Sequence, residues 1–342
     1  MENRHSTSDL AQMQSLPLDV KIRMSKERIR QWYDHYNGEV YVSFSGGKDS
    51  TVLKHIVDSM YKDVPSVFVN TGLEYPELQR FVKDIKEGKY DCFNSDVEII
   101  RPEKRFDEVI KNIGYPVISK RTAQYLYYGR THFEQGRTTS YTKLLDGTST
   151  MKNGEKSFYS CEKWKPLIHA PFKVSHKCCG IMKKDPMKKY GKETGRTPII
   201  GTMADESMGR KDRWMKYGCN SFSEKNPSSQ PMSFWTENDV LEYIRRFNVP
   251  YASVYGDIVE TGKVIHQVLG DVPELKTTGC DRTGCMFCLF GCHLHNDQRF
   301  VRMKETHPKQ YDYCMKPISE GGLGVKDVID WMNENTGTNI QY

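Results

Sequence analysis

The chain has 342 residues, of which 37% are hydrophobic and 27% are charged, and this composition is typical of folded globular proteins rather than disordered ones. A length of this order predicts about two domains. No apolar run of about 18 residues is present, which argues against a membrane-spanning helix, and residues 1–17 lack the apolar core of a secretory signal. We therefore expect a cytoplasmic protein without a membrane partner. Its net charge of +6 permits a polyanionic partner but does not require one.

The hydrophobic pattern predicts helices that alternate with strands. Apolar residues at helical spacing extend from Leu18 to Tyr36. Strands are then predicted at 39–45, 66–72, 96–102 and 196–204, and helices at 49–61, 75–87 and 236–248, the last opened by a threonine cap. This alternation predicts an α/β fold with a Rossmann-like parallel sheet and helices on both faces.

The same pattern predicts three parts of the chain. Residues 1–37 form an N-terminal helical segment, residues 38–260 form the α/β domain, and residues 261–342 form a cysteine-rich C-terminal cap. Within the α/β domain, residues 128–165 are polar and rich in Gly, Ser and Thr, so we expect a surface excursion there.

A glycine turn, SGGKDS, follows the first predicted strand and precedes a helix. Gly46 and Gly47 let the backbone approach a ligand closely, and the free N–H groups of the turn lie at the positive end of the helix dipole. Lys48 adds a mobile positive charge, and Ser45 and Ser50 add hydroxyl donors. The turn therefore predicts a site for a pyrophosphate or sulfate group at the carboxyl end of the strand, although its spacing is not that of a Walker loop.

Several blocks of the sequence resemble a known family. SFSGGKDS resembles the PP-loop of the adenine-nucleotide α-hydrolase superfamily. Five further blocks resemble the phosphoadenosine phosphosulfate (PAPS) reductase family and occur in that family's order: VNTGLEYPEL (69–78), GYPVISK (114–120), HKCCGIMKKDP (176–186), IIGTMADES (199–207) and FWTENDVLEYIRRFNVPYASVYG (234–256). The resemblance implies that the α/β domain is a PP-loop nucleotide-binding domain for ATP or a sulfonucleotide, APS or PAPS.

Reactions at this loop in the family develop charge on phosphoryl or sulfuryl oxygens, so positively charged side chains near the loop are catalytic candidates. Lys48 and Arg210 are such candidates. Asp205 and Glu206 lie beside Arg210 in the sequence, and a structural salt bridge explains these acidic residues nearly as well as a role in the site. Asp49 is expected to cap the helix or to help hold Mg²⁺, and Glu74 to contact ribose or a cation. The catalytic set is therefore Lys48, Asp49 and Arg210. The predicted nucleotide-binding set is Ser45, Gly46, Gly47, Lys48, Asp49, Ser50, Thr71, Gly72 and Glu74.

The ten cysteines of an expected cytoplasmic protein favour metal ligands or catalytic thiols over disulfides. Four of them lie within thirteen residues of the stretch TTGCDRTGCMFCLFGCH, at Cys280, Cys285, Cys288 and Cys292. Closely spaced thiolates suit either tetrahedral zinc or a [4Fe–4S] cluster.

The resemblance implies two alternative ligand sets. In the ATP-pyrophosphatase component of DNA phosphorothioation systems the cysteines gather near the C-terminal part, which favours Cys280, Cys285, Cys288 and Cys292. In assimilatory APS and PAPS reductases that carry a cluster, a Cys-Cys pair combines with a distant Cys-x-x-Cys, which Cys178, Cys179, Cys285 and Cys288 match. Both sets contain Cys285 and Cys288.

One departure from the reductases bears on function. Those enzymes share an ECGLH-like tail whose cysteine attacks the sulfate, whereas no cysteine follows Cys314 here. We therefore favour a PP-loop ATP pyrophosphatase of the sulfurtransferase type, which adenylates a substrate, releases pyrophosphate and prepares iron–sulfur-dependent sulfur transfer. Lys/Arg-rich stretches such as RMSKERIR, KKDPMKKYGK and GRKDRW suggest a nucleic acid substrate, DNA or tRNA, and a cysteine desulfurase is then an expected partner.

Two alternatives remain. The first is an APS or PAPS reductase that forms sulfite with thioredoxin and uses Cys314 or Cys292 as its nucleophile. The second is a nucleotide- or cluster-sensing regulator without turnover, which the intact SGGKDS turn disfavours.

Overall fold

The computed structural model describes residues 4–222 and 225–342. The chain forms two compact units. Unit 1 comprises Met1–Asn70, Glu74–Arg101 and Pro186–Thr283, and unit 2 comprises Thr71–Leu73, Pro102–Asp185 and Gly284–Tyr342. The boundaries of these two units differ from the predicted boundaries after residues 37 and 260. The predicted division into three domains stays a prediction.

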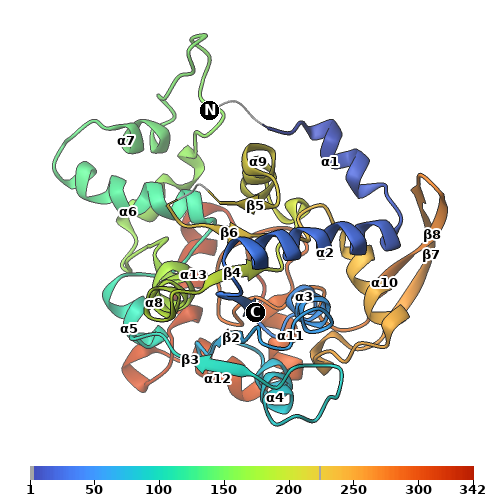
Figure 1. The fold of residues 1–342 in the computed structure, drawn as a ribbon. Coiled ribbons are helices and arrows are strands. Elements are labelled where there is room, and N and C mark those ends of the chain that lie inside the picture. The colour runs from blue at the N-terminus through green and yellow to red at the C-terminus, as the bar shows by residue number, and fades with distance from the viewer. Residues whose placement is uncertain (1–3, 223–224) are drawn as a thin grey trace. The chain divides into compact units, whose positions relative to one another are not determined.

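Unit 1 is built on a six-stranded sheet with the order β3-β2-β1-β4-β6-β5 (Figure 1). Its strands are β1 (Val40–Phe44), β2 (Ser66–Val69), β3 (Val97–Ile100), β4 (Thr197–Ile200), β5 (Asn220–Ser221) and β6 (Ser228–Ser229). All neighbouring strands are parallel except β5, which pairs antiparallel with β6. The predicted Rossmann-like parallel sheet is therefore confirmed, with β1 at its centre.

Helices cover both faces of this sheet. The helices of unit 1 are α1 (Thr7–Gln14), α2 (Leu18–His35), α3 (Lys48–Asp58), α4 (Pro76–Lys86), α8 (Asp185–Thr194), α9 (Met208–Tyr217) and α10 (Glu237–Phe247). Side chains alternate along β1: Val40 and Val42 join the main core with residues of α2, α3, α4 and α10. Tyr41 points to the opposite face, where its ring centroid lies 5.0 Å from that of Tyr190 in α8.

The helix α10 begins as predicted. Thr236 and Asp239 form a reciprocal capping box, in which the Thr236 hydroxyl accepts from the Asp239 N–H and the Asp239 carboxylate accepts from the Thr236 N–H. Asp239 also forms a buried ion pair with Lys21 of α2, at 2.6 Å. The pair therefore joins α2 to the N-terminal end of α10.

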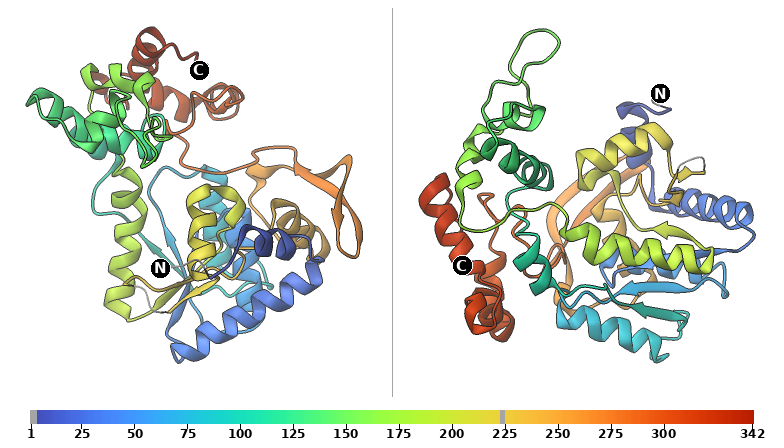
Figure 2. Two further views of the ribbon diagram at one scale, coloured as in Figure 1. Left: turned by 90° about the horizontal axis from the view of Figure 1, so that it is seen from above. Right: turned by 90° about the vertical axis from the view of Figure 1, so that its left-hand side faces the viewer.

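A two-stranded hairpin follows α10 and completes unit 1. Its strands are β7 (Ile258–Gln267) and β8 (Gly270–Thr277), and Figure 2 draws it as a long ribbon in orange. The chain after β8 leads residues 278–283 to the carboxyl end of the central strand, where they contact the SGGKDS turn.

Unit 2 is helical. It contains α5 (Phe106–Asn112), α6 (Lys120–Glu134), α7 (Ser140–Leu145), α11 (Arg299–Thr306), α12 (Pro308–Met315) and α13 (Val325–Thr336), with a 3₁₀ helix at Glu162–His169 and a π-helical turn at Gly180–Lys184. Backbone and side-chain bonds join its distant segments: the Tyr115 hydroxyl donates to the carbonyl of Leu323 at 2.7 Å, and the Gly291 N–H donates to the carbonyl of Ile118 at 2.8 Å. Among the helices of the described residues, none is long and apolar enough to cross a membrane.

Candidate functional site: a phosphate-type turn and a group of thiols

The SGGKDS turn connects the end of β1 directly to α3. Gly46 has φ +73°, a left-handed conformation that favours glycine, and a Cβ there would lie 3.0 Å from Cγ2 of Val82. At Gly47, a Cβ would lie 3.2 Å from the hydroxyl of Tyr255. The turn can therefore pack this closely against Val82 and Tyr255 because both positions are glycine. Gly47 is also the N-cap of α3 and has no side chain to cap it, and Asp49 is already the second residue of the helix, so the predicted capping role of Asp49 is wrong.

Hydroxyl groups hold the turn together. The Ser50 hydroxyl accepts from the Ser45 N–H at 3.1 Å and donates to the carbonyl of Gly47 at 2.9 Å. The hydroxyls of Ser45 and Ser50 are 2.9 Å apart. The two predicted serines thus shape the turn, while its glycines keep the backbone open.

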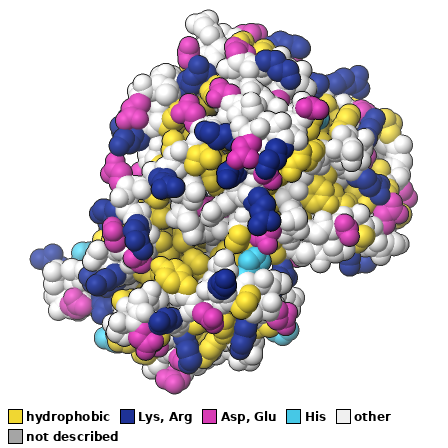
Figure 3. Space-filling model, turned by 90° about the horizontal axis from the view of Figure 1, so that it is seen from below, with side chains coloured by type: hydrophobic (Ala, Val, Ile, Leu, Met, Phe, Trp, Pro, Cys, Tyr) yellow, Lys and Arg dark blue, Asp and Glu magenta, His cyan; other side chains and the backbone are white. Residues whose placement is uncertain are grey.

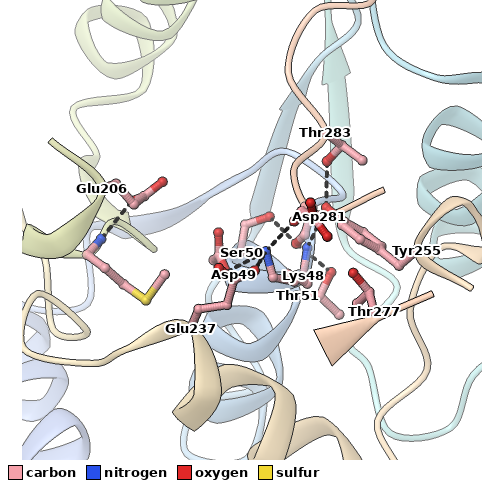
Figure 4. Close-up of polar contacts among 12 residues, drawn as sticks. Lys48, Asp49, Ser50, Thr51, Glu206, Glu237, Tyr255, Thr277, Asp281 and Thr283 are labelled. Carbon is pink, nitrogen blue, oxygen red and sulfur yellow. Dashed lines mark hydrogen bonds and ion pairs between the residues drawn. The ribbon is translucent and has the colours of Figure 1, made fainter. Parts of the chain in front are cut away.

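Lys48 is buried at the start of α3 and has several partners, which Figure 4 shows. Its ammonium donates to the carbonyl of Asp281 at 2.9 Å and lies 3.1 Å from the carboxylate of Glu237 and 3.8 Å from that of Asp49. Its backbone N–H donates to the hydroxyl of Tyr255 at 3.1 Å. Burial lowers the pKa of Lys48, but Asp49, Glu237 and Tyr255 outweigh it and raise the pKa above its ordinary value. Lys48 is therefore a positive charge at neutral pH.

Asp49 lies among three positively charged side chains. Burial raises the pKa of this carboxyl most strongly and Glu237 raises it further, whereas Lys48, Arg282 and Arg210 lower it, and the net result is a raised pKa. Its Oδ1 atom has no hydrogen-bond partner among residues 4–222 and 225–342, although the Lys48 ammonium lies 3.8 Å away. The role of Asp49 as a ligand of nucleotide-bound Mg²⁺ stays a prediction.

Arg210 reaches this group of charges from α9. Its guanidinium forms an ion pair with Glu206. Burial and the charge of Arg282 lower the pKa of Arg210, whereas Asp49 raises this pKa. Since Arg210 interacts electrostatically with both Asp49 and Arg282, the structure places the predicted arginine near the turn. Glu206 accepts in addition from the backbone N–H of Met203 at 2.9 Å, which positions the arginine's partner.

Sequence reasoning missed the contribution of residues 255–283. The Tyr255 hydroxyl is hydrogen-bonded to that of Thr283, and the Lys48 ammonium lies 5.6 Å from the centroid of the Tyr255 ring. Arg282 belongs to the cysteine stretch, where only the thiols drew attention. Tyr255 could have been found, because it lies inside the block 234–256 that resembles the family.

The remaining predicted nucleotide ligands belong to different parts of the chain. Glu74 is buried and belongs to unit 1, whereas Thr71 and Gly72 belong to unit 2. The Thr71 hydroxyl accepts from the N–H of Leu73 at 3.2 Å, so it closes a local turn. The nucleotide roles of these three residues stay predictions.

The cysteines divide between the units. Cys178, Cys179, Cys285 and Cys288 all belong to unit 2, whereas Cys280 belongs to unit 1. Burial raises the pKa of Cys178, and Cys179, Cys285 and Cys288 raise it further. These four thiols are therefore electrostatic neighbours, with the π-helical turn Gly180–Lys184 directly after the pair. In the described part of the chain, no three Cys, His, Asp or Glu side chains are placed to hold a single metal ion.

This arrangement bears on the choice between the two ligand sets. A donor set of four sulfurs is the one that [4Fe–4S] clusters use. The Cys-Cys set belongs to one unit, whereas the set with Cys280 includes residues of both units. The cluster and both ligand sets stay predictions.

Some arginines of the Lys/Arg-rich stretches bond to side chains of the protein itself. Arg213 of GRKDRW donates to the hydroxyls of Ser221 and Ser228 at 3.0 and 2.9 Å and so joins α9 to strands β5 and β6. Arg30 of RMSKERIR pairs with Glu27 one turn away on α2. On the face drawn in Figure 3, Lys and Arg side chains are interspersed with Asp and Glu, so that face carries no field of one sign.

Comparison with known proteins decides the family. The model of the phosphoadenosine phosphosulfate reductase domain matches residues 39–132 and 141–289, which is more than half of the chain. The chain belongs to the phosphoadenosine phosphosulfate reductase domain family. The predicted recognition is thereby confirmed, and the matched region contains the turn, Arg210 and the four thiols of the Cys-Cys set.

Individual relatives are distant. An uncharacterized protein of Methanocaldococcus jannaschii is 23% identical over 265 residues, which cover 76% of this chain and 38% of that protein. An adenosine 5'-phosphosulfate reductase of Pseudomonas aeruginosa is 23% identical over 65% of this chain and 64% of its own length, and adenosine 5'-phosphosulfate reductase 2 of Bacillus subtilis is 24% identical over 66% and 72%. The chain thus spans less than two thirds of the first two.

Among solved structures, the crystal structure of a PAPS reductase from Candida auris in a phosphate complex covers 72% of this chain and 96% of its own. The TM-score is 0.38 and the sequence identity is 14%.

Proposed function

We propose that this protein is a PP-loop enzyme that binds ATP at the SGGKDS turn and transfers its adenylyl group to a substrate. The observation that supports this most directly is the buried ammonium of Lys48 at the start of α3, where the N-cap residue is Gly47 of the glycine turn. Arg210 and Arg282 also act electrostatically on the neighbouring Asp49 carboxyl, against the effect of Glu237. Fixed positive charges and a helix N-terminus are what a polyphosphate needs in order to bind and to react.

The reaction needs one bond to form and one to break. A substrate oxygen attacks the α-phosphorus of ATP, the bond from that phosphorus to the bridging oxygen breaks, and pyrophosphate leaves. Lys48 and the two arginines would balance the charge on the phosphoryl oxygens, and Oδ1 of Asp49, which accepts no hydrogen bond from the described residues, would hold the Mg²⁺ that accompanies the nucleotide. Glu237 and Asp281 keep Lys48 in place until the phosphates arrive.

Unit 2 would supply the sulfur chemistry. Cys178, Cys179, Cys285 and Cys288 would hold a [4Fe–4S] cluster, with zinc as the alternative metal, and such a cluster can carry electrons or bind sulfur. The acceptor proposed here is a nucleic acid, DNA or tRNA, and a cysteine desulfurase would provide the sulfur.

A second candidate is a sulfonucleotide reductase, which the gathering of the Cys-Cys set favours and which the names of the Pseudomonas and Bacillus relatives suggest. That reaction needs an accessible thiolate. Cys314 and Cys292 are 0% and 2% exposed, and burial raises the pKa of Cys314. Neither thiol suits the role, and for this reason we place the adenylating enzyme first.

The two candidates differ in their products. Anaerobically purified protein would be supplied with ATP and, separately, with APS and PAPS plus reduced thioredoxin, and pyrophosphate and sulfite would be measured. We expect pyrophosphate from ATP that disappears in Lys48→Ala. Sulfite from APS or PAPS without pyrophosphate from ATP would make the protein a reductase, and no product of either kind with retained nucleotide binding would favour a regulator.

A further inference from the structure

The positive charge of the chain is concentrated in one segment of unit 2. Residues 119–177 contain eleven lysines and arginines but only four aspartates and glutamates, an excess larger than the +6 of the whole chain. Three of the four acidic side chains are already engaged by cations of the same segment: Glu134 by Arg130, Asp146 by Lys165 and Glu162 by Lys156. The segment therefore offers a surplus of cations to an anionic partner.

Aromatic side chains line a pocket on this segment. Phe158 is 86% exposed and Tyr159 is 51% exposed, and both contribute to a cavity of about 400 Å³ together with Tyr125 and Trp164. Several aromatic rings around one open cavity differ from the single exposed apolar residues that any surface carries. We call this the basic-aromatic pocket, since Arg121 and Lys163 also line it, whereas its one acidic lining residue, Glu162, is paired with Lys156.

The two cations of the basic-aromatic pocket lie close to its rings. The Arg121 guanidinium is 4.5 Å from the centroid of the Tyr159 ring, and the Lys163 ammonium is 4.9 Å from that of Trp164. Ser160 also lines the pocket, and its hydroxyl has no hydrogen-bond partner among the described residues. The pocket thus combines stacking faces, positive charge and an unused hydroxyl.

Backbone bonds hold the loop that carries these rings. The Ser157 N–H donates to the carbonyl of Ser149 at 2.7 Å, and the Cys161 N–H donates to that of Leu144 at 3.0 Å. The backbone at both ends of the segment 157–161, which carries Phe158 and Tyr159, is therefore bonded to α7 or to the chain just after it. A backbone held in this way loses less conformational entropy on ligand binding than a free loop does.

We propose that the basic-aromatic pocket binds single-stranded nucleic acid, with bases stacked on Phe158 and Tyr159 and phosphates held by Arg121 and Lys163. Stacking requires bases that are not already paired and buried in a duplex, which selects single strands over double strands. This inference rests on the proposed function in one respect: it gives the adenylation reaction a single-stranded acceptor. The binding itself does not need ATP, so it can be tested alone.

The test is fluorescence anisotropy of the full chain, without nucleotide, with labelled single strands of about 16 residues as DNA and as RNA, and with the matching duplexes. Phe158→Ala removes one stacking face, and a loss of about 5- to 150-fold in affinity for single strands is expected. Arg121→Ala removes a phosphate contact and should flatten the dependence of log Kd on log salt by about 0.7.

The matched control is Phe247→Ala on α10, because Phe247 is 44% exposed and lies 5.6 Å from the guanidinium of Arg246, yet belongs to unit 1. Its affinity should equal that of the wild type. Phe158 is on the surface, and circular dichroism of each variant would check that it is folded. An unchanged affinity in Phe158→Ala, or duplexes bound as tightly as single strands, would overturn the proposal.

The outcomes separate this inference from the proposed function. Pyrophosphate release from ATP by a protein that binds no single strand would refute the basic-aromatic pocket as a nucleic acid site and leave the adenylating enzyme intact. Binding that depends on Phe158, without pyrophosphate release under any condition, would support the pocket and refute the proposed reaction.

Discussion

The buried ion pair of Lys21 and Asp239 allows a quantitative prediction about unit 1. Their side chains are 0% and 1% exposed and 2.6 Å apart, and Asp239 also caps α10. In Lys21→Ala, the carboxylate of Asp239 stays buried without its counter-ion. Removal of one partner of a buried pair costs about 3–5 kcal/mol in free energy of unfolding. Asp239 lies two residues after Glu237, the first residue of α10, whose carboxylate contacts Lys48 of the glycine turn. Lys21→Ala should therefore also weaken nucleotide binding.

A second ion pair between the same two helices provides the control. Arg246 of α10 and Asp19 of α2 are 2.9 Å apart, but their side chains are 46% and 60% exposed. Exposed pairs contribute about 0–1 kcal/mol, so Arg246→Ala should be nearly neutral.

Urea denaturation followed by tryptophan fluorescence measures both variants, since Trp32 and Trp235 lie in the core of unit 1. Adding Asp239→Asn to Lys21→Ala should restore part of the loss, because it removes the uncompensated charge. Equal losses in Lys21→Ala and Arg246→Ala would refute this reasoning, since burial would then make no difference.

Three further predictions concern the site and the pH dependence of stability. Lys48→Met should weaken ATP binding about 10- to 150-fold in isothermal titration calorimetry, because hydrogen bonds to a charged group contribute about 1.5–3 kcal/mol; unchanged affinity would contradict the role of the turn. Cys288→Ser should abolish the iron content of anaerobically purified protein while Cys280→Ser retains it, and the reverse result would favour the other ligand set. The pKa of His55 is lowered by burial and by the charges of Lys26 and Lys62. The neutral form of His55 therefore contributes stability above about pH 6.5, and this contribution is lost as the pH falls through the lowered pKa. His55→Gln should therefore lose less stability between pH 7 and 5 than the wild type, with exposed His266→Gln as the control, and equal losses would show that His55 is not responsible.

Local patterns were enough to predict most of the sheet and its helices. The alternation of Val40, Tyr41 and Val42 gives β1 two buried faces, and such strands can be recognised from short apolar runs between turns. The N-cap at Thr236 could likewise be predicted from the sequence, because a capping residue acts on the helix that directly follows it.

The parts of the site that come from far along the chain could not be predicted in this way. Tyr255 lies before the hairpin of β7 and β8, and Asp281 and Arg282 lie after it. All three act on the turn from more than 200 residues away, and no local periodicity records such a contact. The helix α7 was also missed inside the polar excursion, since it buries only Thr142 and Leu145 and shows little apolar pattern.

The central claim, that the protein transfers the adenylyl group of ATP, is tested most directly by determining which P–O bond of ATP is broken. ATP labelled with ³²P at the γ position would be incubated with the protein, Mg²⁺ and single-stranded nucleic acid, and the labelled products would be separated. Attack at the α-phosphorus predicts that all released label appears as pyrophosphate and that none is released by Lys48→Met. Label released as orthophosphate, with ADP as the second product, would show attack at the γ-phosphorus and contradict the account.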